Sequence, residues 1–343
     1  MQRFNTIWKV VMALVLLGTS VSVDAQEHEE HKDKKEHKEK TESKHLPAVI
    51  WRNPGNISAL NLLYGPGGAE HAPDPNGKFT FIEEDKSGSS PKFDVKDANG
   101  VKWRVKLGAE PQSETAATRL LWAAGYFADE DYYLPTMKVE GLPKLRRGQE
   151  YVSDDGLVRG ARLKRKDKNI HKLGNWDWFK NSFVGTKPLN GLRVMMALVN
   201  NWDLKDINNV IYLVDGEQRY VVSDLGASFG KTGNTITRTK SDVQGYEKSD
   251  FIQNATPTTV DFALHSRPFV LTAIDVPNYR TRTKMEEITK HIPRADAKWI
   301  GQLLGQLSEP QIRDCFRSAG YSQEEVEGYT RTVLDRIAAL NAL

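Results

Sequence analysis

Residues 191–230 read GLRVMMALVNNWDLKDINNVIYLVDGEQRYVVSDLGASFG and form the most specific pattern in the chain. Apolar residues at helical spacing predict a buried helix from Leu189 to Asn200. A polar run from Asp203 to Asn208 follows, and then two apolar segments that indicate a strand hairpin. The second segment ends directly before Asp224. We therefore expect a helix and a strand to deliver these polar side chains to one place.

The polar residues of this segment have the types that phosphoryl transfer requires. Asp203 opens the loop after the helix and is the candidate for positioning an attacking hydroxyl group, and Lys205 would neutralise the transferred phosphoryl group. Asn208 and Asp224 carry the amide and carboxylate oxygens that Mg²⁺ prefers. Each half of the pattern alone is also typical of an ordinary polar loop or turn. The two halves together favour catalysis.

The chain before this segment predicts a small antiparallel sheet followed by a helix. Alternating apolar residues indicate three consecutive strands, and Asn99-Gly100 indicates a hairpin turn before the third strand. A helix is expected at once, with Ser113-Glu114 at its start and Gly125 as its stop. The expected strands cover residues 79–84, 92–96 and 101–107.

One basic residue of the third strand is the candidate for binding nucleotide phosphates. Lys106 lies at the end of Trp-Arg-Val-Lys, a spacing like the V-A-I-K of kinases, and Lys102 and Arg104 on the same face are rivals. Glu114 would hold the lysine by an ion pair, although a helix dipole alone also favours an acid in the first turn. Gly88, between the first two strands, is the candidate for the turn that covers the phosphates.

These motifs together resemble the protein-kinase-like superfamily, and within it the atypical branch of HipA and the phosphoinositide-kinase-like enzymes. The helix from Ser113-Glu114 to Gly125 matches the branch's helix pattern, and Asn201 to Asn208 matches its catalytic loop N-x-D-x-H-x-x-N. The resemblance covers about residues 79–230 and implies binding of ATP with Mg²⁺ and transfer of the γ-phosphate to a hydroxyl group. The chain departs from the pattern at Lys205, where that branch has histidine.

The resemblance implies an α+β fold with two lobes. We expect a sheet-and-helix N-lobe at 46–135 and a mainly helical C-lobe at 136–343 that contains the catalytic loop. Ser308 with Gln311, and Ser322 with Glu325, fit capping boxes of two late helices. The polar stretch 231–250 is long enough for a mobile loop like a kinase activation segment. Strand-like pieces are expected from Met137 to Leu163. The basic residues between Arg162 and Lys172 indicate a solvated loop, with a site for an acidic substrate as the alternative.

The N-terminus predicts export from the cytoplasm. Residues 1–25 have the basic start, short apolar core and small residues of a signal peptide, with cleavage near Ala25. The following residues 26–45 are rich in histidine, lysine and glutamate and predict a disordered linker, with loose metal binding as the alternative. We expect a periplasmic or secreted protein with no membrane span in the mature chain.

Composition limits the remaining function classes. The formal net charge of +3 argues against nucleic acid as a partner. The single cysteine, Cys315, lies on the apolar face of an expected helix and indicates a buried small side chain. Within these limits, the resemblance to kinases implies an ATP- and Mg²⁺-dependent phosphotransferase that acts on a hydroxyl group of a protein, lipid or small molecule outside the cytoplasm. The alternative is a catalytically inactive kinase-fold binding or scaffold protein, because ATP is scarce outside the cytoplasm.

Overall fold

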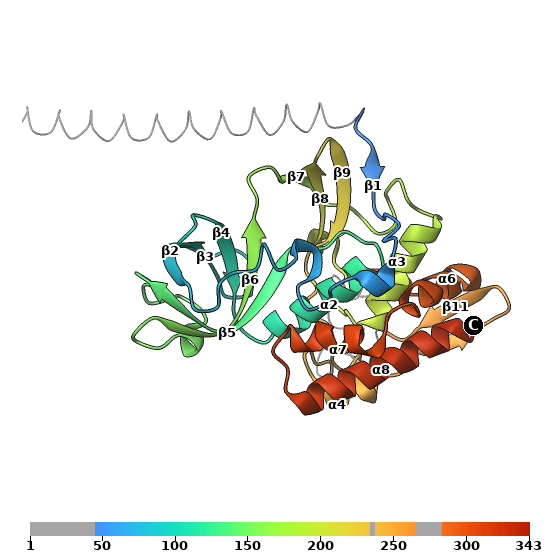
Figure 1. Ribbon diagram of the computed structural model, residues 1–343. Coiled ribbons are helices and arrows are strands. Elements are labelled where there is room, and N and C mark those ends of the chain that lie inside the picture. The colour runs from blue at the N-terminus through green and yellow to red at the C-terminus, as the bar shows by residue number, and fades with distance from the viewer. Residues whose placement is uncertain (1–44, 234–236, 265–282) are drawn as a thin grey trace, which may run out of the picture.

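The structure is a computed structural model that describes residues 45–233, 237–264 and 283–343. It combines a sheet-rich N-terminal part with a mainly helical C-terminal part, as the sequence predicts (Figure 1). The predicted signal peptide and all but the last residue of the predicted linker lie outside the described residues. Within the described part, no helix is both long enough and apolar enough to span a membrane.

Five strands of the N-terminal part close into a barrel. The three predicted strands are confirmed, and each pairs with the next in antiparallel order. Alternation puts Trp103 and Val105 inside with Phe93, Val95 and Leu163, and these side chains form a separate apolar core. The strand order is β2 (Lys78–Asp85), β3 (Lys92–Asp97), β4 (Lys102–Lys106), β6 (Leu157–Lys166) and β5 (Asp131–Glu140).

The barrel extends beyond the sequence-based lobe boundary. A boundary at residue 135 falls inside β5, and β6 lies further along the chain. The prediction of a solvated loop that begins at Arg162 is wrong, because Arg162 lies in β6 and is buried. Its neighbours Ala161 and Leu163 point into the barrel core, so the charged side chains occupy the outer face of a strand.

Helix α2 (Pro111–Ala123) connects the barrel with the helical part (Figure 1). Its apolar residues Ala117, Leu120 and Leu121 belong to the large core of the C-terminal part, while its N-terminal turn faces the barrel. The other helices of that part include α3 (Lys187–Leu198), α4 (Val243–Glu247), α6 (Arg294–Leu304), α7 (Glu309–Arg317) and α8 (Gln323–Asn341). Both predicted capping boxes are present, at the starts of α7 and α8.

A second sheet carries the predicted hairpin. Its turn is Asp215-Gly216, where both residues have positive φ. The N-terminal segment contributes a short strand that pairs in parallel with the hairpin. The sheet order is β1 (Ala48–Val49), β9 (Glu217–Val222), β8 (Asn209–Val214) and β7 (His171–Gly174). A third sheet consists of β10 (Ile252–Ala255), β11 (Thr259–Phe262) and β12 (Ile292–Pro293).

The stretch 231–250 is built into the C-terminal part where the structure describes it. It contains α4, and Tyr246 of that helix is buried against Phe229 and Tyr329. Short 3-10 helices lie in the loops, at η2 (Ile57–Ala59), η3 (Gly65–Gly67), η4 (Gln149–Tyr151) and η5 (Asp206–Asn208). The fold therefore brings the end of β4, the start of α2 and the exit of β9 to one place.

Candidate active site

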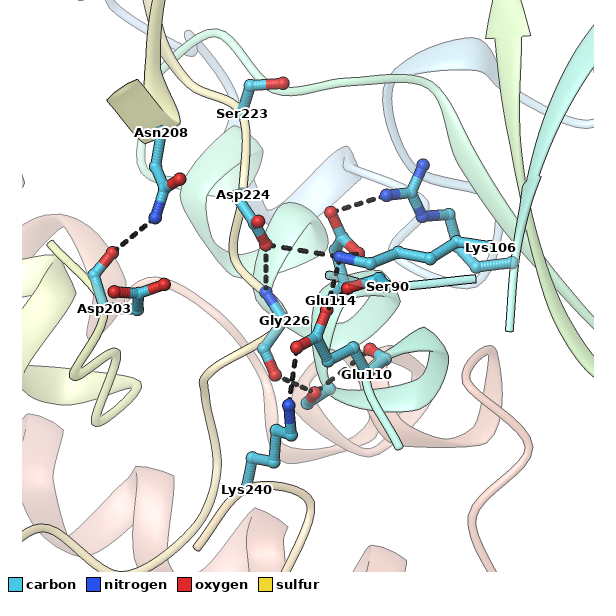
Figure 2. A network of polar contacts seen from close by, with 12 residues as sticks. Ser90, Lys106, Glu110, Glu114, Asp203, Asn208, Ser223, Asp224, Gly226 and Lys240 are labelled. Carbon is cyan, nitrogen blue, oxygen red and sulfur yellow. Dashed lines mark hydrogen bonds and ion pairs between the residues drawn. The ribbon is translucent and has the colours of Figure 1, made fainter. Parts of the chain in front are cut away.

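Lys106 lies at the centre of the site. It is the last residue of β4, and its side chain is only 5% exposed. Its Nζ lies 2.6 Å from Glu110 Oε2, 2.9 Å from Glu114 Oε2 and 3.3 Å from Asp224 Oδ1 (Figure 2). Burial disfavours the charged ammonium group, yet the three carboxylates outweigh burial and raise the pKa of Lys106. The lysine is therefore held as a cation.

Glu114 connects this lysine to the barrel. It lies in the first turn of α2, is fully buried and accepts from Arg162 Nη2 at 2.6 Å through its other oxygen. Burial acts to raise the pKa of Glu114, but Arg162 and Lys106 outweigh it and lower the pKa. The carboxylate is therefore ionised and fixed between two cations. The sequence pattern assigned Arg162 to a basic patch and did not indicate its contact with Glu114.

A second row of charges continues from Arg162. Its Nη1 lies 3.4 Å from Asp131 Oδ1, and burial raises the pKa of Asp131 to about 7. On the next outward position of β6, Lys164 Nζ lies 2.5 Å from Asp129 Oδ2 and 3.4 Å from Ser223 Oγ. Ser223 precedes Asp224, so this row connects the barrel to the exit of β9.

The two rival basic residues of β4 do not reach the cluster. Lys102 is exposed, and Arg104 donates through Nε to Asp94 Oδ1 at 2.7 Å. Asp94 is almost fully buried and also accepts from Lys166. Arg104 is thereby committed to an ion-pair network on the barrel surface. Of the three candidates, Lys106 is the one that meets Glu114 and Asp224.

Asp224 leaves strand β9 with its carboxylate directed at Lys106. Loss of solvent around the carboxylate and the nearby Glu114 raise its pKa, although 43% of the side chain is exposed. Gly226 N donates back to Asp224 Oδ1 at 3.2 Å. The absence of a side chain at Gly226 serves close packing, because a Cβ there would lie 2.7 Å from the side chain of Glu110.

The loop from Asn201 to Asn208 lies opposite this cluster. Asn201 is buried; its Oδ1 accepts from Asp203 N at 3.1 Å, and its Nδ2 donates to Asp224 O at 3.3 Å. Lys205 Nζ lies 2.7 Å from Asp203 Oδ1. Asn208 Nδ2 donates to Asp203 O at 2.7 Å, which turns the amide oxygen the other way (Figure 2). Asn201 thus ties the loop with Asp203 to the segment with Asp224.

Gly88 lies in the turn between β2 and β3 with a φ of +64°. A Cβ there would meet only Lys92 Nζ, at 3.5 Å, so the turn is open around Gly88. The residue of this turn that reaches the cluster is Ser90, whose Oγ donates to Glu110 Oε2 at 3.0 Å. The turn therefore contacts the site through a hydroxyl group that the sequence pattern did not indicate.

The site offers oxygen ligands suited to a divalent cation. Carboxylate oxygens of Glu110, Glu114 and Asp224 lie within 4.8 Å of one another. Two of these acids are engaged with cations from other elements, since Glu114 binds Arg162 and Glu110 binds Lys240 Nζ at 2.5 Å. The partly exposed Asp224 and the amide oxygen of Asn208 fit the preference of Mg²⁺ for carboxylate and amide oxygens.

A separate cavity of about 560 Å³ lies beyond Lys164. It is bounded by the loop after α2, the end of β6 and the β8–β9 hairpin, and Phe127 and Tyr212 contribute aromatic walls. None of the seven residues proposed from the sequence lines this cavity. The cavity therefore borders the row of charges at Asp129 and Lys164 rather than the cluster around Lys106.

Comparisons with known proteins found no matching family model and no matching curated protein. Among solved structures, a proinflammatory kinase of Helicobacter pylori, CtkA, is similar over 78% of this chain and 98% of its own, with 11% identity and a TM-score of 0.44. The Golgi casein kinase is similar over 79% of this chain and 73% of its own, with 10% identity and a TM-score of 0.36. A structure of the Golgi casein kinase with Mn/ADP bound is similar over 78% of this chain and 75% of its own, with 10% identity and a TM-score of 0.33.

Proposed function

We propose that this protein is a kinase-like phosphotransferase that binds ATP with Mg²⁺ and transfers the γ-phosphate to a hydroxyl group. The observation that carries the proposal is the position of Lys106. Its ammonium group lies 2.9 Å from a helix-borne glutamate and 3.3 Å from an aspartate at the exit of a strand. These are the parts that clamp nucleotide phosphates in kinase folds, and they come from three elements in the expected order.

The residues of the cluster would hold the nucleotide and its metal. Lys106 would contact the phosphates, and Glu114 keeps the lysine directed into the site with Arg162 behind it. Asp224 and Asn208 would be the ligands of Mg²⁺. A bound Mg²⁺ would supply positive charge against the phosphate oxygens. The partly exposed side chain of Asp224 leaves its carboxylate accessible for that role.

Asp203 would act on the acceptor. Its carboxylate stands on the side of the site facing away from the barrel, and 28% of its side chain is exposed (Figure 2). It would orient the attacking hydroxyl group and accept its proton as the oxygen bonds to the γ-phosphorus, while the bond from that phosphorus to the bridging oxygen breaks and ADP leaves. Lys205, 2.7 Å away, would then neutralise charge on the transferred phosphoryl group. The acceptor belongs to the class of hydroxyl-bearing proteins, lipids or small molecules, outside the cytoplasm.

A second function is a kinase-fold binding protein that transfers no phosphate. The observation in its favour is that Lys106 already contacts three carboxylates, which compete with an anionic ligand for the same ammonium group. The two functions differ in one measurable respect. A phosphotransferase requires Asp203 for turnover, whereas a binding protein does not use that carboxylate at all.

The test is transfer of label from γ-labelled ATP by the mature chain and by Asp203→Ala, with a periplasmic extract as a source of acceptors. We expect the substitution to lower the transfer rate about 10²–10⁴-fold, as is typical for loss of a general base, with little change in ATP affinity. Asp215→Asn is the matched control, because Asp215 lies in the exposed hairpin turn and asparagine tolerates its positive φ. Equal rates in the Asp203→Ala variant and the control would remove Asp203 as the catalyst.

A further inference from the structure

We propose that Lys240 is a second phosphate-binding residue and that Glu110 occupies the position between Lys240 and Lys106 which a phosphate group would take. The inference rests on the proposed function and deepens it, because it names the polyphosphate chain as the ligand of a two-lysine site. It also assigns Glu110 as the internal anion that the polyphosphate must displace.

The Glu110 carboxylate bridges the two lysines. Its Oε2 lies 2.6 Å from Lys106 Nζ, and its Oε1 lies 2.5 Å from Lys240 Nζ (Figure 2). Ser90 Oγ adds a third donor at 3.0 Å. Burial acts to raise the pKa of Glu110, but the two lysines outweigh it and lower the pKa to about 2. Two ammonium groups and a hydroxyl group around one ionised group with two oxygens are also a suitable donor set for a phosphate.

Glu110 has no structural task in its own helix that would explain this position. It is the N-cap residue of α2, but its side chain makes no capping hydrogen bond. The next residue is Pro111, which has no N–H to be satisfied. The side chain of Glu110 also packs against Gly226, where any Cβ would collide with it. The side chain is therefore committed to the two lysines rather than to the helix.

Lys240 is placed by the backbone of the segment that follows Asp224. Ser241 N donates to Ser228 O at 3.0 Å, and Thr239 N donates to Lys231 O at 3.0 Å, so this segment runs beside residues 228–231. Trp202 of the catalytic loop donates through Nε1 to Thr239 O at 2.8 Å. The neighbours of Lys240, Thr239 and Ser241, are thus held by hydrogen bonds to the segment that follows Asp224 and to the loop that contains Asp203.

Glu110 and Glu114 each bridge two cations, but Glu114 is fully buried whereas Glu110 is partly exposed, so Glu110 is the acid that can leave for solvent. Glu114 remains held by Arg162, and the Asp224 carboxylate accepts from Gly226 N. When a polyphosphate enters, Glu110 would exchange its lysine contacts for solvent, and the lysines would exchange one anion for another. Because Ser90 also donates to Glu110, the β2–β3 turn would be released in the same step.

The experiment is calorimetric titration of the full mature chain with tripolyphosphate in the absence of metal. Glu110→Gln removes the competing charge while keeping the shape, and we expect tripolyphosphate to bind at least about tenfold more tightly than to the unsubstituted chain. Adding Lys240→Met to Glu110→Gln should cancel this gain. Adding Lys248→Met, an exposed lysine of the same region, should leave it intact. Thermal unfolding checks the fold, and Glu110→Ala serves as a second variant if Glu110→Gln is unfolded.

Each outcome decides the inference. Equal affinity of Glu110→Gln and the unsubstituted chain for tripolyphosphate overturns it, and so does a gain that survives Lys240→Met. Weaker binding of tripolyphosphate with Mg²⁺ by Glu110→Gln also overturns it, because Glu110 would then be a metal ligand. A parallel titration with Mg²⁺ and ATP separates this inference from the proposed function. Tighter tripolyphosphate binding without any ATP binding would support the two-lysine site and contradict the kinase assignment.

Discussion

Lys106 and Glu114 lie in surroundings that a purely structural ion pair does not need. A buried ion pair is stable only where further hydrogen bonds satisfy its remaining protons and lone pairs, because removing charges from water is costly. Here Lys106 contacts three carboxylates, and the side chain of one of them, Asp224, is 43% exposed. The cluster is therefore buried at Lys106 and Glu114 and accessible at Asp224. This asymmetry suits a cation that binds a charged ligand.

Substitution of Lys106 tests this interpretation at the residue scale. Lys106→Met should weaken binding of ATP with Mg²⁺ by more than about tenfold, since a charge-assisted contact to phosphate is lost. Lys102→Met should bind as the unsubstituted chain does, because Lys102 is exposed. Isothermal titration measures both. Lys106→Arg retains the charge and controls for folding. A larger loss in Lys102→Met than in Lys106→Met would reassign the clamp.

The sequence could predict some residues of the site but not others. Lys106, Glu114 and Asp224 lie at fixed offsets from a strand, a helix start and a strand end, so local patterns indicate them. Glu110 and Lys240 meet across 130 residues of sequence, and their contact depends on how the chain folds back after Asp224. No local pattern carries that information, and Glu110 has the ordinary appearance of an acid before a helix.

At the scale of elements, the sequence pattern indicates strand-like pieces as far as Leu163 but not the charged end of β6. The inward residues of β6 are small or apolar, but its outward residues are Arg162, Lys164 and Lys166. Such a run of charge is typical of a solvated loop. In the fold these side chains are paired with the acids Glu114, Asp129 and Asp94. The strand is stable because its partners come from distant segments, which the sequence pattern of β6 alone does not show.

Helix α8 allows a test of local helix signals. Ser322 accepts from Glu325 N, and Glu325 accepts from Ser322 N at 2.9 Å, so two N-terminal donors of the helix are satisfied. Ser322→Ala should lower the free energy of unfolding by about 1 kcal/mol without changing nucleotide binding. Urea unfolding measures the effect, with Ser58→Ala in an exposed loop as the control. An unchanged midpoint would show that tertiary packing alone determines where α8 begins.

At the scale of the whole molecule, polar contacts join the barrel to the helical part. Ser113 Oγ of α2 donates to Gly226 O at 2.8 Å, and Lys164 of β6 reaches Ser223. Both contacts flank Asp224. The segment that would bind the metal is thus held by the N-terminal part of the molecule, although it belongs to the C-terminal part in sequence. Binding at Asp224 is therefore coupled to how the two parts meet.

Asp131 makes a pH-dependent contribution to the free energy of unfolding. Burial raises its pKa to about 7, whereas an unfolded aspartate titrates near 3.9. Between these values the folded chain binds more protons than the unfolded chain, so this carboxyl group lowers stability as pH rises from about 4 to about 7. In Asp131→Asn the free energy of unfolding should fall less over this pH range, by on the order of a few kcal/mol. Denaturant unfolding at about pH 4.5 and about pH 7.5, close to these two limits, measures the difference. An equal fall in both proteins would place the buried proton on another group.

The kinase interpretation of the whole site depends on nucleotide binding that requires metal. The measurement is titration of ATP into the chain without its predicted signal peptide, with and without Mg²⁺, repeated with Asp224→Asn. We predict saturable binding of one nucleotide per chain that requires Mg²⁺, and a loss of at least about tenfold in affinity in Asp224→Asn. Absence of binding at millimolar concentrations of ATP and Mg²⁺, or binding that Asp224→Asn leaves unchanged, would contradict the assignment of this cluster as a nucleotide site.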